Sequence, residues 1–190
     1  MSVLSAAVPA LAGGERTRGG AHANAPAAVD FDALFRRIYP SLHRYVHRMT
    51  GDADAADDIA QEAFVRLLTR TMPEDEARLW LFTVATNLFR DSARTYKRRE
   101  RLLSAVPMNV GHLPAPDEPV ERGQEIERVR AALSLLTPRE RTMLLMREEG
   151  FRYDEIAGVT DVAPGSVGTL LARALRRFTA AYEGGRKEAR

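Results

Sequence analysis

Apolar residues recur every three or four positions along two stretches of this chain, and no stretch alternates apolar and polar residues as a half-buried strand does. The first stretch covers residues 30–101 and the second covers residues 121–182. Such spacing places the apolar side chains on one face of each helix, where they can form a core. The sequence therefore predicts an all-α protein with two small helical domains.

Three segments lack this spacing. Residues 1–29 are mostly Ala, Gly and Pro, and they contain too few large apolar side chains to offset the entropy lost on ordering, so we expect a disordered arm. Residues 102–120 contain four prolines, which remove amide donors and disfavour helix, and we expect a flexible linker there. Residues 183–190 are expected to form a C-terminal tail.

The first domain is predicted to contain three helices. The first begins near Phe31 and ends at Gly51, with a kink or restart at Pro40. The second has Asp52 or Asp54 as its N-cap. Its predicted buried residues are Ile59, Ala63, Phe64, Leu67 and Leu68. The third runs from about Asp75 to Arg99, with Leu81, Val84, Ala85 and Leu88 on its inner face.

The second domain contains a helix-start motif at Thr137-Pro138-Arg139-Glu140. Thr137 can accept from the amide of Glu140, and Glu140 can reach back to the amide of Thr137, so the four residues predict a capping box. The new helix is expected to end at Gly150. A short helix around Asp154–Ala157, a connector at Gly158–Ala163 and a long helix from about Pro164 to Tyr182 then predict a helix-turn-helix.

The charges are segregated although the formal net charge is only +2 and the pI is about 9.2. Acidic residues gather at Asp52–Glu62 and basic residues at Arg90–Arg101. The basic run is compatible with phosphate binding. Acidic residues also suit the start of a helix, so dipole complementation and solubility are an alternative role for the acidic block.

Two patterns suggest metal binding. Asp54, Asp57 and Asp58 form an Asp-x-x-Asp-Asp pattern like a magnesium site, but no second acidic motif follows it. His43 and His47 have the spacing of a metal pair but lack a third ligand. The sequence has no cysteine, no catalytic triad pattern and no glycine-rich phosphate loop. We therefore expect no metal, no cofactor and no enzymatic activity.

Four motifs, which follow one another in the order expected of that family, resemble the extracytoplasmic-function (ECF) group of bacterial sigma factors. Residues 57–64 resemble the helix of sigma domain 2 that docks on the clamp helices of RNA polymerase, and residues 80–87 resemble its promoter-melting helix. Residues 136–141 and 153–157 resemble sigma domain 4, where a helix-turn-helix follows a capped helix. The resemblance implies a factor that binds core RNA polymerase, directs initiation at specific promoters and melts promoter DNA.

The resemblance also implies three sets of site residues. The polymerase-binding set is Asp57, Asp58, Gln61, Glu62 and Phe64. The set for the minus-ten element is Trp80, Thr83, Asn87, Arg90, Arg94, Lys97 and Arg98. The set for the minus-thirty-five element is Arg152, Tyr153, Ser166, Thr169, Arg173, Arg176 and Arg177.

Alternatives remain for several of these residues. Trp80 also fits a core position, since a single large aromatic at helical spacing usually packs inside. The cations after it also fit a solvated helix face. Gly168 and Leu170 stand where relatives usually carry Lys or Arg, and the short loop at residues 71–76 has no aromatic to hold a flipped base. Upstream readout is therefore expected to depend on Ser166, Thr169 and Arg173.

The expected partners are core RNA polymerase, through its clamp helices and flap, promoter DNA and an anti-sigma factor. We expect a cytoplasmic protein without membrane insertion, because no segment approaches the roughly 20 apolar residues of a membrane span. The main rival interpretation is a repressor or activator that uses the helix-turn-helix without polymerase. A metal-dependent enzyme and a three-helix protein-binding module are further alternatives.

Overall fold

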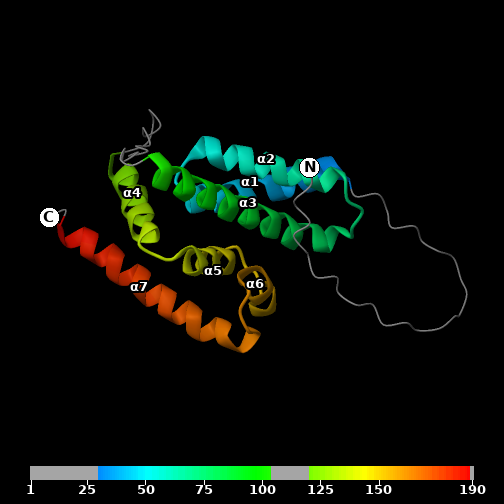
Figure 1. Cartoon of the computed structure of the whole chain (residues 1–190). Coiled ribbons are helices and arrows are strands. Elements are labelled where there is room, and N and C mark those ends of the chain that lie inside the picture. The colour runs from blue at the N-terminus through cyan, green and yellow to red at the C-terminus, as the bar shows by residue number, and fades with distance from the viewer. Residues whose placement is uncertain (1–29, 104–119, 189–190) are drawn as a thin grey trace, which may run out of the picture.

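The computed structural model describes residues 30–103 and 120–188, without the side chains of residues 93–103, 120–122 and 186–188. Every regular element in these ranges is helical, which confirms the all-α prediction (Figure 1). The helices are α1 (Phe31–Thr50), α2 (Ala53–Leu68), α3 (Glu74–Leu103), α4 (Val120–Ser134), α5 (Pro138–Glu148), α6 (Tyr153–Thr160) and α7 (Val167–Glu188), with a 3-10 turn η1 (Pro164–Ser166) before α7. The predicted arm, most of the predicted linker and residues 189–190 lie outside the described residues.

Helix α1 continues through Pro40, so of the predicted kink or restart at that residue the restart is wrong. The proline removes one amide donor, but Leu34, Ile38 and Leu42 are all buried on the same face of α1. Packing of this face on α2 and α3 compensates for the missing hydrogen bond, because most helix stability in proteins comes from tertiary burial.

The predicted helix ends are confirmed where local chemistry determines them. Gly51 ends α1 in the left-handed region at φ 76°, and its amide donates to the carbonyl of His47. The Asp52 carboxylate accepts from the amides of Asp54 and Ala55 at 2.9 and 3.1 Å, so Asp52 is the N-cap of α2. The turn between α1 and α2 therefore follows directly from two adjacent residues.

The core of α1–α3 contains Leu42, Tyr45, Phe64, Leu81 and Phe82. The predicted burial of Leu68 is wrong, since this side chain is 63% exposed. It continues the outward row of α2 that includes Gln61 and Val65, whereas Ala60, Ala63, Phe64 and Leu67 form the buried row.

The capping box at Thr137 and Glu140 is confirmed, and it starts α5. Gly150 has φ 85°, as the predicted left-handed cap requires. Helix α6 extends to Thr160, further than predicted, and Asp161 ends it at φ 54°. The connector to α7 is therefore shorter than the predicted Gly158–Ala163, and α6 and α7 form the expected helix-turn-helix (Figure 1).

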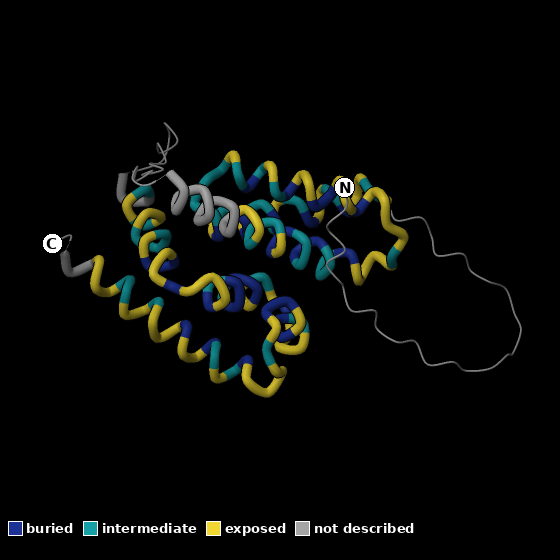
Figure 2. Tube along the Cα trace, in the orientation of Figure 1, coloured by how far each residue is buried: buried dark blue, intermediate teal, exposed yellow. Residues whose placement is uncertain are grey.

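Helices α5 and α6 pack against α1 and α3, so the two predicted domains share one hydrophobic core. Figure 2 shows buried residues on both sides of this junction. At its centre the rings of Phe82 on α3 and Phe151 before α6 meet edge to face, with 4.8 Å between their centroids. The spacing of apolar residues along the chain gave no prediction of this contact.

Candidate polymerase and promoter surfaces

The outward face of α2 combines acidic, polar and apolar side chains. Asp58, Gln61 and Glu62 are exposed, and Glu62 forms an ion pair with Arg66 one turn later, with 2.8 Å between Oε1 and Nε. Val65 and Leu68 are 55% and 63% exposed on the same side of the helix. This face can therefore offer a partner both charge and apolar area, and the sequence analysis missed its two apolar members.

Asp57 and Phe64, the other members of the polymerase-binding set, have contacts inside the protein. Asp57 accepts a hydrogen bond from the Tyr39 hydroxyl at 2.9 Å and lies 3.2 Å from Nε2 of His43. Phe64 is 2% exposed and packs edge to face with Phe35, 4.8 Å between centroids. Phe64 therefore packs α2 on α1 from the core, and Asp57, whose side chain is 50% exposed, joins the two helices at the edge of the outward face.

Helix α3 carries the residues expected at the minus-ten element on one side. Asn87 is exposed, Thr83 is half-buried, and the Thr83 hydroxyl donates back to the carbonyl of Leu79 at 2.7 Å. Trp80 is half-buried against the core and has the guanidinium of Arg70 5.6 Å from its ring centroid. Trp80 therefore presents part of its ring at the surface and anchors the rest in the core.

Arg90, the next member of this stripe, reaches the other half of the molecule. Its Nη1 donates to the carbonyl of Val159 on α6 at 3.1 Å. The expected contacts of Arg94, Lys97 and Arg98 fall where side chains are not described, although α3 itself continues to Leu103. In this arrangement Arg90 is turned toward α6 rather than outward.

The helix-turn-helix presents two hydroxyl residues at the start of α7. Ser166 and Thr169 are exposed there, and Val167, Leu171 and Ala174 are buried on the opposite face, as the spacing predicted. The positive end of a helix and exposed hydroxyl groups both suit phosphate or base contacts. A Cβ added at Gly168 would make an ordinary van der Waals contact with the ring of Tyr153, 3.5 Å from its Cε2.

Tyr153 and Arg152 precede α7 at the start of α6. Tyr153 is 46% exposed, and the guanidinium of Arg147 lies 5.4 Å from its ring centroid. Arg152 is exposed and forms an ion pair with Asp154 at 3.2 Å. Both side chains are accessible beside the start of α7, where the sequence analysis expected backbone contacts.

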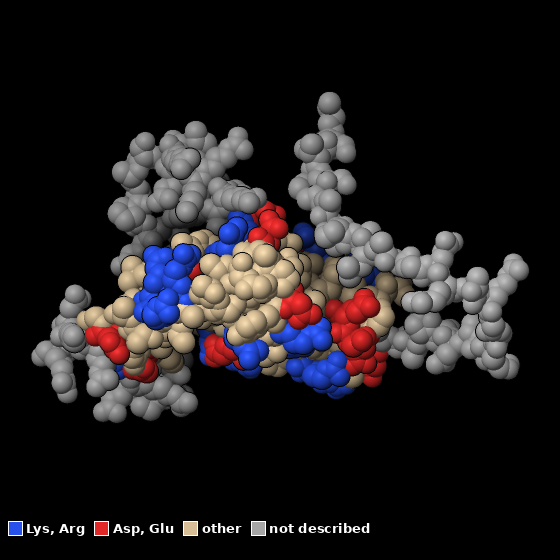
Figure 3. Space-filling model, turned by 90° about the horizontal axis from the view of Figure 1, so that it is seen from below, with Lys and Arg blue, Asp and Glu red and all other residues tan. Residues whose placement is uncertain are grey.

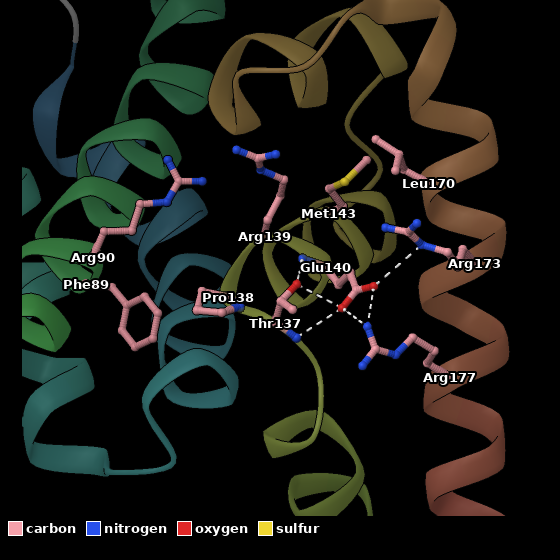
Figure 4. Close-up of a pocket in the computed structure, with 10 residues that line it drawn as sticks. All are labelled: Phe89, Arg90, Thr137, Pro138, Arg139, Glu140, Met143, Leu170, Arg173 and Arg177. Carbon is pink, nitrogen blue, oxygen red and sulfur yellow. Dashed lines mark hydrogen bonds and ion pairs between the residues drawn. The ribbon is translucent and has the colours of Figure 1, made fainter. Parts of the chain in front are cut away.

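Two of the three arginines expected on α7 point to a buried carboxylate (Figure 4). Nη1 of Arg177 lies 2.9 and 3.0 Å from the two oxygens of Glu140, and Nε of Arg173 lies 3.9 Å from Oε1. Glu140 is 4% exposed. Burial tends to raise the pKa of Glu140, but hydrogen bonds from Thr137 and the pairing with Arg177 outweigh it and lower that pKa.

On the face of the molecule drawn in Figure 3, the described basic residues do not form one continuous patch. Figure 3, viewed from below, shows Lys and Arg in separate patches with Asp and Glu among them. Arg176 is exposed on α7, while Arg173 and Arg177 lie beside the Glu140 carboxylate. The structure thus separates the three predicted arginines into two that are paired to Glu140 and one that faces solvent.

Phe89, Arg90, Arg139, Arg173 and Arg177 line a cleft of about 550 Å³ between α3 and the helices α5 and α7. Figure 4 shows Phe89 and Arg90 on one side of this cleft and the α7 arginines on the other. Among the described residues, no group of three or more His, Asp or Glu side chains is placed to hold a metal ion. No described helix is long and apolar enough to cross a bilayer.

Helical domains that include a helix-turn-helix, as the described residues form, are typical of DNA-binding transcription proteins. Residues 34–99 match the family model of Sigma-70 region 2, and residues 126–178 match that of Sigma-70 region 4. This chain belongs to the ECF RNA polymerase sigma factors, and its class of activity is transcription initiation with RNA polymerase.

Curated relatives cover most of both sequences. The ECF RNA polymerase sigma factor EcfG of Rhodopseudomonas palustris is 31% identical over 154 residues, which are 74% of this chain and 78% of that protein. SigL of Mycobacterium tuberculosis is 32% identical over 161 residues, covering 79% of this chain and 89% of SigL. These matches establish the family that the sequence motifs indicated.

A solved structure shares the fold. The sigma factor RpoE from Bartonella quintana, crystallised with the anti-sigma factor NepR, matches with a TM-score of 0.65 and 20% identity. The match covers 81% of this chain and 97% of the RpoE chain. The arrangement of helices is therefore one that a known sigma factor also adopts.

Proposed function

We propose that this chain binds core RNA polymerase through the outward face of α2, recognises the minus-thirty-five element through α6 and α7, and melts the minus-ten element with α3. The observation that carries the proposal is the position of Asn87, exposed on the long helix α3 on the same side as the partly exposed ring of Trp80, about two turns away. An amide and an aromatic ring beside a basic helix end suit unstacked bases and their phosphates.

Polymerase docking is assigned to Asp58, Gln61 and Glu62 together with Val65 and Leu68. Phe64 supports this face from the core, where it is buried, and the half-exposed Asp57 supports it from the edge through its hydrogen bond with Tyr39. Charge reversal at Asp58 is expected to reduce capture by immobilised core polymerase by at least tenfold. Reversal of the exposed Glu76, at the start of α3, is the matched control and should leave capture unchanged.

The decisive experiment is run-off transcription with purified core polymerase, combined with permanganate detection of unpaired thymines. Asn87→Ala should reduce both strand opening and transcript yield, while Ser92→Ala, an exposed change on another side of α3, should affect neither. Arg173→Ala should weaken upstream promoter binding, with Thr179→Ala on α7 as its control. Normal opening by Asn87→Ala would refute the melting role.

The same assay distinguishes the rival interpretation. A repressor or activator that works without polymerase would bind DNA by itself and would create no new start sites with core enzyme. The docking face on α2 supports the sigma interpretation, because a regulator of that kind has no use for it. The sigma role also implies action in the cytoplasm, where RNA polymerase works.

An anti-sigma factor is proposed as a further partner. The support is the fold shared with RpoE of Bartonella quintana, which was solved with the anti-sigma factor NepR. Loss of promoter-directed transcription on addition of such a protein, and its recovery with excess sigma chain, is the expected result.

A further inference from the structure

Four arginines from three helices surround one cleft. Arg90 comes from α3, Arg139 from α5, and Arg173 and Arg177 from α7, and the cleft between them has a volume of about 550 Å³. Sites for small molecules typically enclose about 300–1,000 Å³, so this cleft has the size of such a site. Its lining therefore combines a space large enough for a small molecule with an excess of positive charge.

The negative charge in the lining is committed to one side of the cleft. Glu140 is the one acidic residue among those that line it. Its oxygens lie 2.9 and 3.0 Å from Nη1 of Arg177, and one of them lies 3.9 Å from Nε of Arg173. The Glu140 carboxylate is therefore paired with the α7 arginines, and it offsets neither Arg90 nor Arg139.

Arg90 and Arg139 bring two further cations to the same cleft. Figure 4 shows their guanidinium groups extending into it from α3 and from α5. Arg90 donates to the carbonyl of Val159, which is a neutral acceptor and uses one of five N–H donors. Arg139 is exposed, and no acidic side chain of the described residues forms an ion pair with it. Two like charges in one cleft repel each other, and an anion bound between them would relieve that repulsion.

The rest of the lining is apolar. Phe89 is half-buried and packs against the core, and Figure 4 shows its ring and Pro138 below the two guanidinium groups in that view. Nucleic-acid bases stack on aromatic rings, and arginine binds phosphate through paired N–H groups. An aromatic ring beside two arginines therefore suits a ligand that carries both a base and phosphates.

We propose that this cleft binds a nucleoside polyphosphate, with the phosphates between Arg90 and Arg139 and the base against Phe89. A terminal phosphate carries a charge of about −1.5 to −2 at pH 7, whereas each phosphate within a nucleic-acid strand carries one. Two cations in one small cleft match the more concentrated charge. The inference does not depend on the proposed function, because it needs neither polymerase nor promoter DNA.

The test uses ADP as the probe, added to the full chain without magnesium and followed by isothermal titration calorimetry. Pyrophosphate and adenosine represent the two parts of the ligand. We expect saturable binding of one ADP per chain, with pyrophosphate at least fivefold weaker and adenosine weaker still. Absence of saturable ADP binding would overturn the proposal, and equal affinities for ADP and pyrophosphate would contradict the contact with the base.

Arg139→Ala tests the phosphate contact. This side chain is exposed, so its removal should leave the fold intact, which circular dichroism can verify. ADP binding is expected to weaken at least tenfold. Arg36→Ala removes another exposed arginine, on α1 and outside the cleft, and should leave ADP binding unchanged. Equal weakening by the two variants would mean that ADP binds to basic residues in general, which would overturn the proposed site.

Phe89→Leu tests the base contact, because leucine keeps an apolar side chain against the core but removes the ring. Binding of ADP should weaken about fivefold or more, and binding of pyrophosphate should stay unchanged. The same loss for both probes would contradict a contact between Phe89 and the base.

A competition experiment separates a free nucleotide from the phosphates of DNA. Hexathymidylate without a terminal phosphate carries bases and singly charged phosphates, and it should not displace ADP at the same phosphate concentration. Displacement of ADP by hexathymidylate, with a tenfold loss of hexathymidylate affinity in Arg139→Ala, would assign the cleft to nucleic acid and overturn the proposal.

Discussion

Arg177 donates from a single nitrogen, Nη1, to both carboxylate oxygens of Glu140, at 2.9 and 3.0 Å. The same carboxylate accepts from the amide and hydroxyl of Thr137 at 3.0 and 2.8 Å, which completes the capping box of α5. One buried carboxylate therefore joins the start of α5 to the middle of α7. It also fixes the direction of an arginine that the sequence analysis assigned to DNA.

Glu140→Gln is expected to lower the free energy of unfolding by about 1–3 kcal/mol, because a neutral amide is a weaker acceptor and leaves Arg177 without its counter-charge. Urea unfolding followed by circular dichroism measures the change. Glu183→Gln, an exposed position on α7, is the control and should be neutral. If Glu140→Gln and the native chain were equally stable, the charge of the Glu140 carboxylate would not contribute to the free energy of unfolding.

The stability difference between the native chain and Glu140→Gln should depend on pH. The pKa of Glu140 is lowered from 4.5, so the folded chain favours the charged form, and this stabilisation is full above the unfolded pKa. It is lost as pH falls through the folded pKa. The difference in stability between native chain and Glu140→Gln should therefore narrow steadily as pH is lowered below about 4.5. A difference that stays constant into strong acid would contradict the assignment.

Tyr45 provides a prediction at alkaline pH. Its hydroxyl lies 2.7 Å from Oγ1 of Thr86, and complete burial raises its pKa from 10.0 to about 12. A raised pKa contributes stability below the unfolded value of 10.0, and this contribution is lost as pH approaches 12. Ultraviolet titration of the folded native chain and of Tyr45→Phe should therefore give the same absorbance change around pH 10. If the native chain showed one more ionising tyrosine than Tyr45→Phe around pH 10, the Tyr45 hydroxyl would be accessible to solvent.

Gly51 and Gly158 should respond to alanine in opposite directions. Gly51 has φ 76°, so Gly51→Ala places a Cβ in the left-handed region and is expected to cost about 1 kcal/mol. Gly158 lies within α6 with open space around it, so Gly158→Ala is expected to add about 0.5–1 kcal/mol. Thermal unfolding of the two variants measures both effects. Stabilisation by Gly51→Ala would be inconsistent with the left-handed cap.

Arg176 and Arg177 should contribute differently to DNA affinity. Arg176 is exposed on α7, whereas the charge of Arg177 is offset by Glu140. Arg176→Ala is expected to lower the slope of log affinity against log salt by about one. Arg177→Ala should change that slope less and should reduce stability more. Fluorescence anisotropy with a promoter duplex over a salt series measures both, and equal slopes for the two variants would contradict this division.

The helices and their ends were predictable because they depend on neighbouring residues. Asp52 caps α2, Thr137 and Glu140 cap α5, and Gly51 and Gly150 take left-handed conformations, all through contacts within a few positions. The exposure of residues on α7 was also predictable, since helical spacing alone determines which side faces the core. The restart predicted at Pro40 is absent because packing of α1 on its neighbours outweighs one missing hydrogen bond.

The partners of the candidate site residues depend on contacts between distant parts of the chain. Arg90 meets the Val159 carbonyl 69 positions later, and Arg177 meets Glu140 37 positions earlier. No local pattern marks such pairs, so the spacing identified both arginines as outward-facing without identifying what they contact. The position of Phe151 in the core has the same origin, because its ring is buried by Phe82 from the other half.

Three arginines, Arg78, Arg90 and Arg141, donate hydrogen bonds across the contact of α1 and α3 with α5 and α6. Each bond goes to a main-chain carbonyl oxygen, which every amino acid supplies. Replacement of Met49, Glu149 or Val159 by another residue keeps the main-chain carbonyl in place as long as the helix end is kept. As acceptors of these bonds the three positions therefore require no particular side chain, whereas each donor position requires the arginine. Among descendants of this protein, retention of the contact should follow the arginines Arg78, Arg90 and Arg141 alone, without paired changes at the residues that they touch.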